Sequence, residues 1–204
     1  MPPVRTVLWE VDAQADFMLP GGKLYVPGAE KIIPNLERLV GAAVAGRALI
    51  VSSADAHSES DPEFANFPPH CVAGTPGARI VPEGMASNFH VVSNEVATAL
   101  PRDLAGFQQI VLQKQALDVF TNPHASELVE RLGCEAEYVV CGVVTEYCVA
   151  CAAGGLLQRR RKVSVVTDAI EALNLQEGRR TIEDLASRGA RLVSTAQAVA
   201  MLRA

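Results

Sequence analysis

The feature that most constrains the fold is a repeated alternation of short apolar segments with longer amphipathic ones. The apolar segments are rich in β-branched residues and lack regular polar alternation, as expected for strands that are buried on both faces of a parallel sheet. The strand candidates are residues 6–11, 48–53, 109–113, 138–144, 163–167 and 191–194.

Helix candidates lie between and after these strands. The segment 29–45 carries one apolar stripe that includes Ile32, Leu36 and Leu39, which is typical of a helix packed on a sheet. The other candidates are residues 125–132, 146–158, 179–187 and 196–202. This order predicts an α/β fold of three layers, α/β/α, around a central parallel sheet of about six strands. We expect the 204 residues to form a single domain, 1–204.

Charge and composition restrict the possible partners. The formal net charge of −5 gives no electrostatic reason to expect binding to nucleic acid or to an anionic membrane. Five cysteines, without the spacing of a disulfide framework, suit a reducing compartment. The sequence shows neither an N-terminal signal nor a long apolar span. We therefore expect a cytoplasmic protein.

Reactive side chains follow several of the predicted strands. Asp12 follows the first, Asp55 and His57 the second, Lys114 the third and Cys148 the fourth. Ligands bind to open parallel sheets at the carboxyl ends of the strands. These residues are therefore expected to lie close together.

Cys148 ends the segment Gly142-Val143-Val144-Thr145-Glu146-Tyr147-Cys148, which leads from a strand into a predicted helix. A thiol in the first turn of a helix lies near unpaired N–H groups and the positive end of the helix dipole, which lower its pKa. The same N–H groups can receive an oxyanion. Taken alone, the segment favours a buried structural cysteine over a catalytic one, because free cysteine is among the most buried residue types.

Asp12 and Lys114 each have a catalytic and a structural interpretation. A carboxylate at the end of a buried strand can hold or remove a proton, but Asp12 or Asp16 can also cap the following turn. A lysine at the end of a strand is usually solvated. Beside a carboxylate and a thiol, the Lys114 ammonium would lower the pKa of the thiol and help to polarise a carbonyl group.

A second group combines Asp55 and His57 with His70, which lies in a long loop rich in proline and glycine. Residues two apart at a strand end point to the same side, and two stiff prolines precede His70. Two histidines and one carboxylate suit a divalent ion such as zinc, iron or manganese. Glu63 lies in the same loop and is a further candidate ligand. The alternative is a pair of ordinary loop histidines.

Together these segments resemble the isochorismatase-like cysteine hydrolases, and within them the nicotinamidase branch. Besides the nucleophile segment and Lys114, the resemblance rests on three stretches that occur in the same order over nearly the whole chain. These are Val11-Asp12-Ala13-Gln14-Ala15-Asp16-Phe17 with Pro20-Gly21-Gly22-Lys23-Leu24 and Val26-Pro27-Gly28 after it, Asp55-Ala56-His57, and Phe67-Pro68-Pro69-His70-Cys71-Val72-Ala73-Gly74-Thr75-Pro76-Gly77.

The resemblance implies a catalytic triad of Asp12, Lys114 and Cys148. Cys148 would attack the substrate carbonyl, Asp12 would pass the thiol proton to the departing ammonia, and water would hydrolyse the thioester. The backbone N–H groups of Val144 and Cys148 would form the oxyanion hole, after a cis peptide bond between Val143 and Val144.

The resemblance also implies a metal and a substrate. Asp55, His57 and His70 would hold one divalent ion, zinc or else iron or manganese, with Glu63 in or near the shell. Phe17 and Phe67 would form aromatic walls, with Tyr147 beside the nucleophile. The implied reaction is hydrolysis of nicotinamide to nicotinate and ammonia, in a homo-oligomer. The alternatives are hydrolysis of another small amide or ureide, isochorismatase-type hydrolysis, and a ligand-binding protein without catalysis.

Overall fold

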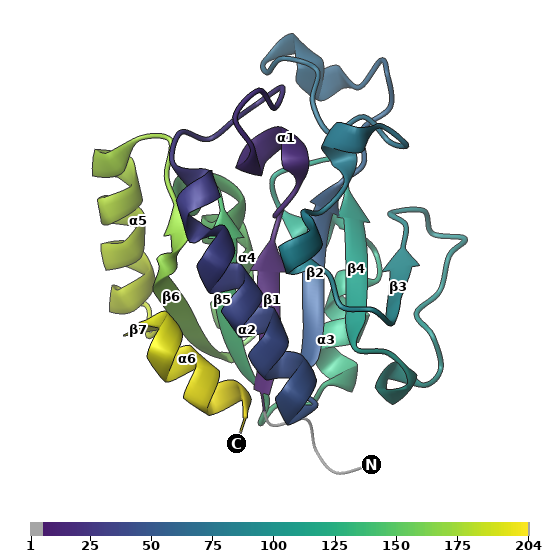
Figure 1. The fold of residues 1–204 in the computed structure, drawn as a ribbon. Coiled ribbons are helices and arrows are strands. Elements are labelled where there is room, and N and C mark those ends of the chain that lie inside the picture. Colours follow the sequence, from purple (N-terminus) through teal and green to yellow (C-terminus); the bar gives the residue numbers. More distant parts are fainter. Residues whose placement is uncertain (1–5, 204) are drawn as a thin grey trace.

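Seven parallel strands form one sheet within residues 6–203, the part of the chain described by the computed structural model (Figure 1). In space their order is β3-β4-β2-β1-β5-β6-β7. This confirms the predicted α/β fold with a central parallel sheet. The strands are β1 (Thr6–Val11), β2 (Leu49–Asp55), β3 (Phe89–Val92), β4 (Gln109–Lys114), β5 (Glu137–Val143), β6 (Lys162–Glu171) and β7 (Arg191–Val193).

The strand β3 is the one that the sequence pattern does not predict. It has only four residues, lies at the edge of the sheet, and leaves Phe89 and Val91 largely exposed. Short edge strands pair on one side only, so their sequences need not carry a long apolar run. The sheet therefore has one strand more than the six candidates.

Helices cover both faces of the sheet, as the three-layer prediction requires (Figure 1). One face packs against α2 (Ile33–Gly46) and α6 (Thr195–Leu202), and the other against α3 (Ala125–Arg131), α4 (Ala150–Gln158) and α5 (Leu175–Ser187). The short helix α1 (Ala15–Met18) lies beyond the carboxyl end of β1.

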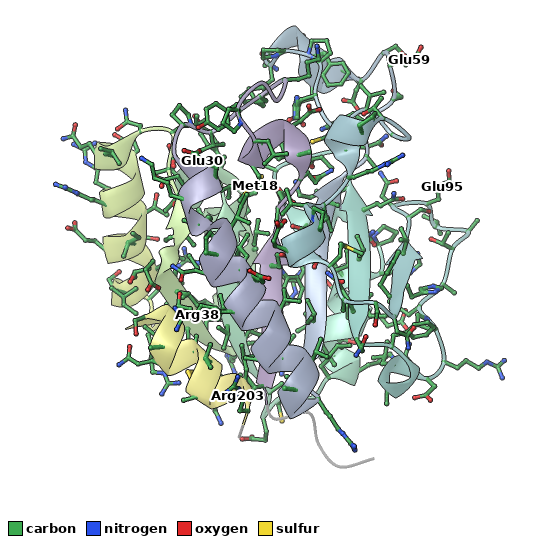
Figure 2. The ribbon with its side chains drawn as sticks, viewed as in Figure 1. Met18, Glu30, Arg38, Glu59, Glu95 and Arg203 are labelled. Atoms are coloured by element: carbon green, nitrogen blue, oxygen red, sulfur yellow. The ribbon has the colours of Figure 1, made fainter. Side chains whose placement is uncertain are left out.

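Each face of the sheet has its own apolar core. Trp9 and Tyr138 pack with Leu128 and Leu156 on the side of α3 and α4, whereas Leu8 packs with residues of α2 on the other. The outer surface of α2 carries the charged side chains of Glu37 and Arg38, of which Arg38 is labelled in Figure 2. Among residues 6–203, no helix combines the length and the apolar character needed to cross a membrane.

The long loop at residues 61–82 runs over the carboxyl ends of the strands (Figure 1). It contains two short 3-10 turns, Pro62–Ala65 and Pro76–Ala78. Backbone hydrogen bonds from Ala15 N to Arg79 O and from Val81 N to Ala13 O tie it to the segment after β1. His57 and Val72 form a further bridge. These contacts hold the loop against the edge where the candidate reactive residues lie.

Candidate active site

Asp12 lies at the end of β1 in a left-handed backbone conformation, with φ of 48°, which aspartate tolerates better than most residues. Its N–H donates to Ser53 O, and Ser53 Oγ donates to Asp12 Oδ1 at 2.6 Å. Only 1% of the residue is exposed. Burial raises the pKa of Asp12, and the charge of Lys114 opposes this rise. Asp12 is therefore a base that holds a proton more readily than a solvated carboxylate does.

Lys114 ends β4 and is paired in register with Asp55 on β2. Its Nζ lies 2.9 Å from Asp12 Oδ2, 2.5 Å from Asp55 Oδ1 and 3.6 Å from Cys148 Sγ. The two carboxylates raise the pKa of Lys114 despite its burial, so the side chain is an ammonium ion. The three predicted triad residues, far apart in the sequence, therefore meet around one cation.

Cys148 follows β5 through a tightly packed turn. Gly142 has φ of 112°, and a Cβ at this position would lie 2.0 Å from Val11 O, so no side chain fits there. The Val143–Val144 peptide bond is cis, as expected. Cys148 then lies in a π-helical turn, Thr145–Val149, and α4 begins only at Ala150. The predicted α-helical first turn is thus a wider π turn, a local form that often occurs at functional sites.

The expectation of a lowered pKa for the Cys148 thiol is wrong. Burial raises the pKa of Cys148, and the charges of Asp12 and Asp55 add to this rise, while the Lys114 ammonium opposes it. Cys148 is 6% exposed, so desolvation outweighs the favourable contacts. The raised pKa favours the neutral thiol form of Cys148, so a neighbouring base would assist removal of its proton.

Asp55, His57 and His70 form a compact buried group whose potential ligand atoms all lie within 4.8 Å of one another. Asp55 Oδ2 is 3.7 Å from His57 Nε2 and 3.8 Å from His70 Nε2. His57 Nε2 is buried without a hydrogen-bond partner among the described residues. An unpaired imidazole nitrogen beside a carboxylate and a second imidazole is the donor set of a divalent transition metal. The three residues fit such an ion.

Both imidazole rings are oriented by contacts on their other nitrogen. His57 Nδ1 lies 3.0 Å from Asp61 Oδ2, and His70 Nδ1 lies 2.8 Å from Pro68 O. A proton on each Nδ1 leaves both Nε2 atoms free to act as ligands. The proline-rich loop therefore fixes His70 through a backbone carbonyl as well as through its stiffness.

Glu63 lies outside this compact group but lines the same cavity as Asp55 and His70. Burial raises the pKa of Glu63, and the negative charge of Asp55 adds to this rise. Its role as a ligand remains a prediction.

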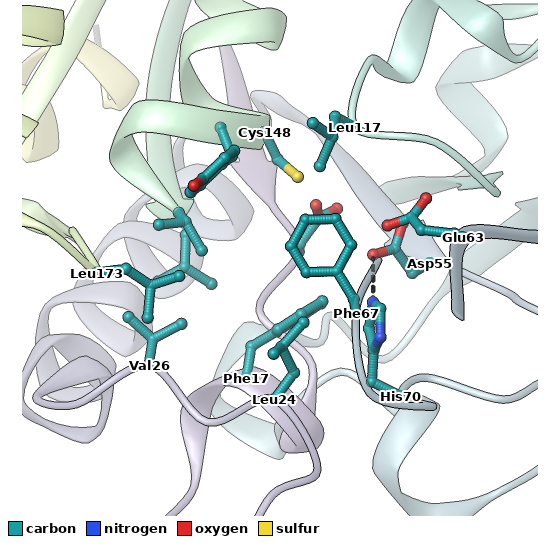
Figure 3. Close-up of a pocket in the computed structure, with 14 residues that line it drawn as sticks. Phe17, Leu24, Val26, Asp55, Glu63, Phe67, His70, Leu117, Cys148 and Leu173 are labelled. Carbon is teal, nitrogen blue, oxygen red and sulfur yellow. Dashed lines mark ion pairs between the residues drawn. The ribbon is translucent and has the colours of Figure 1, made fainter. Parts of the chain in front are cut away.

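An open cavity connects these groups, with about 430 Å³ of empty space when the adjoining open solvent is included. Figure 3 shows Asp55, Glu63 and His70 at one end, and Val26 and Leu173 at the other, with Cys148 between them. The three predicted substrate-contacting residues, Phe17, Phe67 and Tyr147, all line it.

Two residues that contact the candidate site, Gln14 and Asp61, were not predicted from the sequence. The side chain of Gln14 forms two hydrogen bonds with the backbone of Asp55. Asp55 N donates to Gln14 Oε1 at 2.6 Å, and Gln14 Nε2 donates to Asp55 O at 2.8 Å. Asp61 holds His57. The only sequence signal for Asp61 is its position four residues after the histidine, and aspartates at loop positions are common.

A protein-family model and a known enzyme both match most of this chain. The isochorismatase domain model matches residues 6–99 and 86–197. A nicotinamidase of Escherichia coli (strain K12) is 27% identical over 221 residues, which cover 96% of this chain and 97% of that protein.

Solved structures with the same fold include a pyrazinamidase and a nicotinamidase. A pyrazinamidase of Pyrococcus horikoshii in complex with zinc has 29% identity and a TM-score of 0.76, with coverage of 93% of this chain and 99% of that one. A nicotinamidase of Bacillus subtilis, with 18% identity, a TM-score of 0.75 and coverage of 93% and 99%, supports the fold alone.

Proposed function

Because the chain belongs to the isochorismatase family of hydrolases, we propose that it is a metal-containing cysteine amidohydrolase of the nicotinamidase type. Its reaction is the hydrolysis of nicotinamide, or a similar small amide, to the carboxylic acid and ammonia. The observation that carries this proposal is the position of Lys114 Nζ, which lies 3.6 Å from Cys148 Sγ and 2.9 Å from Asp12 Oδ2. Asp12 and Cys148 both line the cavity.

In this mechanism Asp12 removes the proton of the Cys148 thiol as the sulfur attacks the amide carbon. The raised pKa of Asp12 suits a group that accepts a proton and then gives it up. Asp12 passes that proton to the amide nitrogen, the C–N bond breaks, and ammonia leaves a thioester on Cys148. Asp12 then activates a water molecule, which releases the carboxylic acid and restores the thiol. Lys114 keeps both carboxylates in place and offsets the negative charge that develops.

The oxyanion would be received by the backbone N–H groups of Val144 and Cys148. The neighbouring N–H groups of Tyr147 and Val149 already donate to Val144 O, at 3.1 Å each. Val144 and Cys148 line the cavity together with Asp12. Donors aimed at a developing negative charge commonly contribute a factor of about 100 or more to the rate.

Asp55, His57 and His70 would hold the metal ion, with Glu63 beside it. Zinc is the first choice for this donor set, and iron and manganese are the alternatives. When bound, the ion would supply a Lewis-acid contact for a ring nitrogen and so orient the substrate. Asp55 contributes at the same time to the buried ion pair with Lys114.

The cavity walls favour a neutral substrate with flat or apolar faces. Phe17 and Phe67 offer aromatic surfaces, and the polar side chains of the lining are acidic apart from His70 and the Tyr147 and Cys148 side chains. This set disfavours the anionic substrates of isochorismatase-type hydrolysis. A different small amide or ureide processed by the same residues is the main alternative.

A cytoplasmic location and a homo-oligomeric state complete the proposal. The first follows from the cysteine content and the second from the resemblance to the family.

Ammonia release from a panel of small amides, with metal-loaded protein, tests the proposed reaction. We expect nicotinamide to rank among the best substrates and Cys148→Ala to abolish its turnover. Cys134→Ala is the matched control, because Cys134 is an exposed thiol outside the cavity lining. Turnover of nicotinamide by Cys148→Ala at the wild-type rate would refute the thiol mechanism. If another amide is strongly preferred, the assignment of nicotinamide as the substrate is wrong, but the proposed thiol mechanism of amide hydrolysis is not contradicted.

A further inference from the structure

The cavity continues beyond Cys148 on the side away from the metal-binding residues. Figure 3 shows the order along the cavity: Asp55 and His70 at one end, Cys148 in the middle, and Val26 and Leu173 at the other end. A substrate that touches the metal group and presents its carbonyl carbon to Cys148 therefore leaves a part of the cavity unfilled.

This second part of the cavity is apolar. Val26 and Leu173 line it, and Leu173 keeps 45% of its surface exposed. The ionisable lining residues Asp55, Glu63 and His70 lie at the opposite end (Figure 3). Apolar side chains that face an open cavity gain free energy when an apolar ligand covers them.

The position of this compartment relative to the proposed chemistry indicates which part of a substrate it would hold. The acyl part of the amide would extend from Cys148 toward the metal group. The carbonyl oxygen, which the N–H groups of Val144 and Cys148 would receive, and the leaving nitrogen would both face away from the acyl part. A substituent on that nitrogen would enter the compartment. The inference rests on the proposed amide hydrolysis at Cys148.

We propose that Val26 and Leu173 form a leaving-group subsite, so that the enzyme also hydrolyses secondary amides with a small N-alkyl group. Cys148 Sγ forms the thioester as the C–N bond breaks, and the thiol proton passes through Asp12 to the nitrogen. A primary alkylamine leaves in place of ammonia, and water then hydrolyses the thioester to the carboxylic acid.

The test is a series of N-methyl, N-ethyl and N-propyl pyridine-3-carboxamides, with the released alkylamine as the readout. Comparison within the series keeps the intrinsic reactivity of the secondary amide nearly constant. We expect kcat/KM to rise about fourfold for each added methylene group that becomes buried, until the compartment is full.

Leu173→Trp should fill the compartment, and we expect it to lower the N-propyl to N-methyl ratio of kcat/KM about tenfold. The matched control is Leu175→Trp, because Leu175 is 69% exposed at the start of α5 and lies outside the cavity lining. That control should keep the wild-type ratio.

The outcomes separate the subsite from the proposed function. Turnover of nicotinamide with a flat or falling alkyl series in the wild-type enzyme overturns the subsite and leaves the function intact. A rising alkyl series without turnover of nicotinamide supports the subsite and overturns the nicotinamide assignment. If no amide is cleaved by the metal-loaded enzyme, both inferences are wrong.

Discussion

Lys114 and Asp55 face each other at the ends of neighbouring strands, with Lys114 Nζ 2.5 Å from Asp55 Oδ1. The other oxygen of the same carboxylate faces His57 Nε2 and His70 Nε2. One buried aspartate thus belongs to both the proposed catalytic group and the proposed metal group. The two groups are therefore one electrostatic unit, in which a change at Lys114 affects the residues on both sides.

Lys114→Met should destabilise the fold as well as stop catalysis. The change leaves Asp12 and Asp55 buried without their shared cation, and loss of one partner of a buried ion pair costs about 3–5 kcal/mol. Denaturant unfolding followed by the fluorescence of Trp9, the only tryptophan, measures this cost. The double variant Lys114→Met/Asp12→Asn should recover part of the lost free energy of unfolding. A single variant as stable as wild type would contradict the buried ion-pair network.

Asp61→Asn should weaken metal binding without removing a proposed ligand. Asp61 orients His57 through Nδ1, and loss of such a partner typically lowers metal affinity about 10–100-fold. The matched control is Asp103→Asn, because both aspartates also accept a hydrogen bond from the backbone N–H two residues later. Zinc titration against a competing chelator gives the affinities. Equal affinities in both variants would show that Asp61 does not support the site.

Glu10→Gln should stabilise the protein at alkaline pH. Glu10 is buried in β1, and burial raises its pKa from the ordinary 4.5 to about 8. The folded state therefore holds this proton more tightly than the unfolded state. The contribution to stability is fully present below about pH 4.5 and is lost as the pH rises through about 8.

The variant lacks this titration, so its advantage in unfolding free energy should grow with pH and level off above pH 8 at roughly 2–5 kcal/mol. Unfolding midpoints of both proteins across this pH range measure the difference. Glu37→Gln, at an exposed position of α2, is the control. A difference that does not vary with pH would show that Glu10 is ionised when buried.

The sequence predicted most of the sheet because buried parallel strands have a clear pattern. Six strands and the positions of Asp12, Asp55, Lys114 and Cys148 at their carboxyl ends could be predicted from it. The edge strand β3 could not, because half of its residues face outward and its apolar run is short. Binding of the metal by Asp55, His57 and His70 stays a prediction, although these residues lie together.

The electrostatic state of the site could not be predicted from local sequence. A thiol at a helix start indicates a low pKa, but the pKa of Cys148 depends on burial, on the charge of Lys114 and on the carboxylates of Asp12 and Asp55. The contacts of Gln14 and Asp61 have the same origin, since each joins segments whose approach depends on the whole fold. Electrostatic interactions and hydrogen bonds of this kind depend on distances that only the folded chain defines.

The most direct test of the central claim is the detection of a covalent acyl group on Cys148 during turnover. Acid-quenched reactions with nicotinamide, digested and analysed by mass spectrometry, should show a nicotinoyl thioester on the peptide that contains Cys148. Asp12→Asn should reduce the rate at which this adduct forms. If turnover is rapid and unaffected by Cys148→Ala, and no acylated peptide appears at any quench time, the proposed role of Cys148 as the nucleophile is wrong.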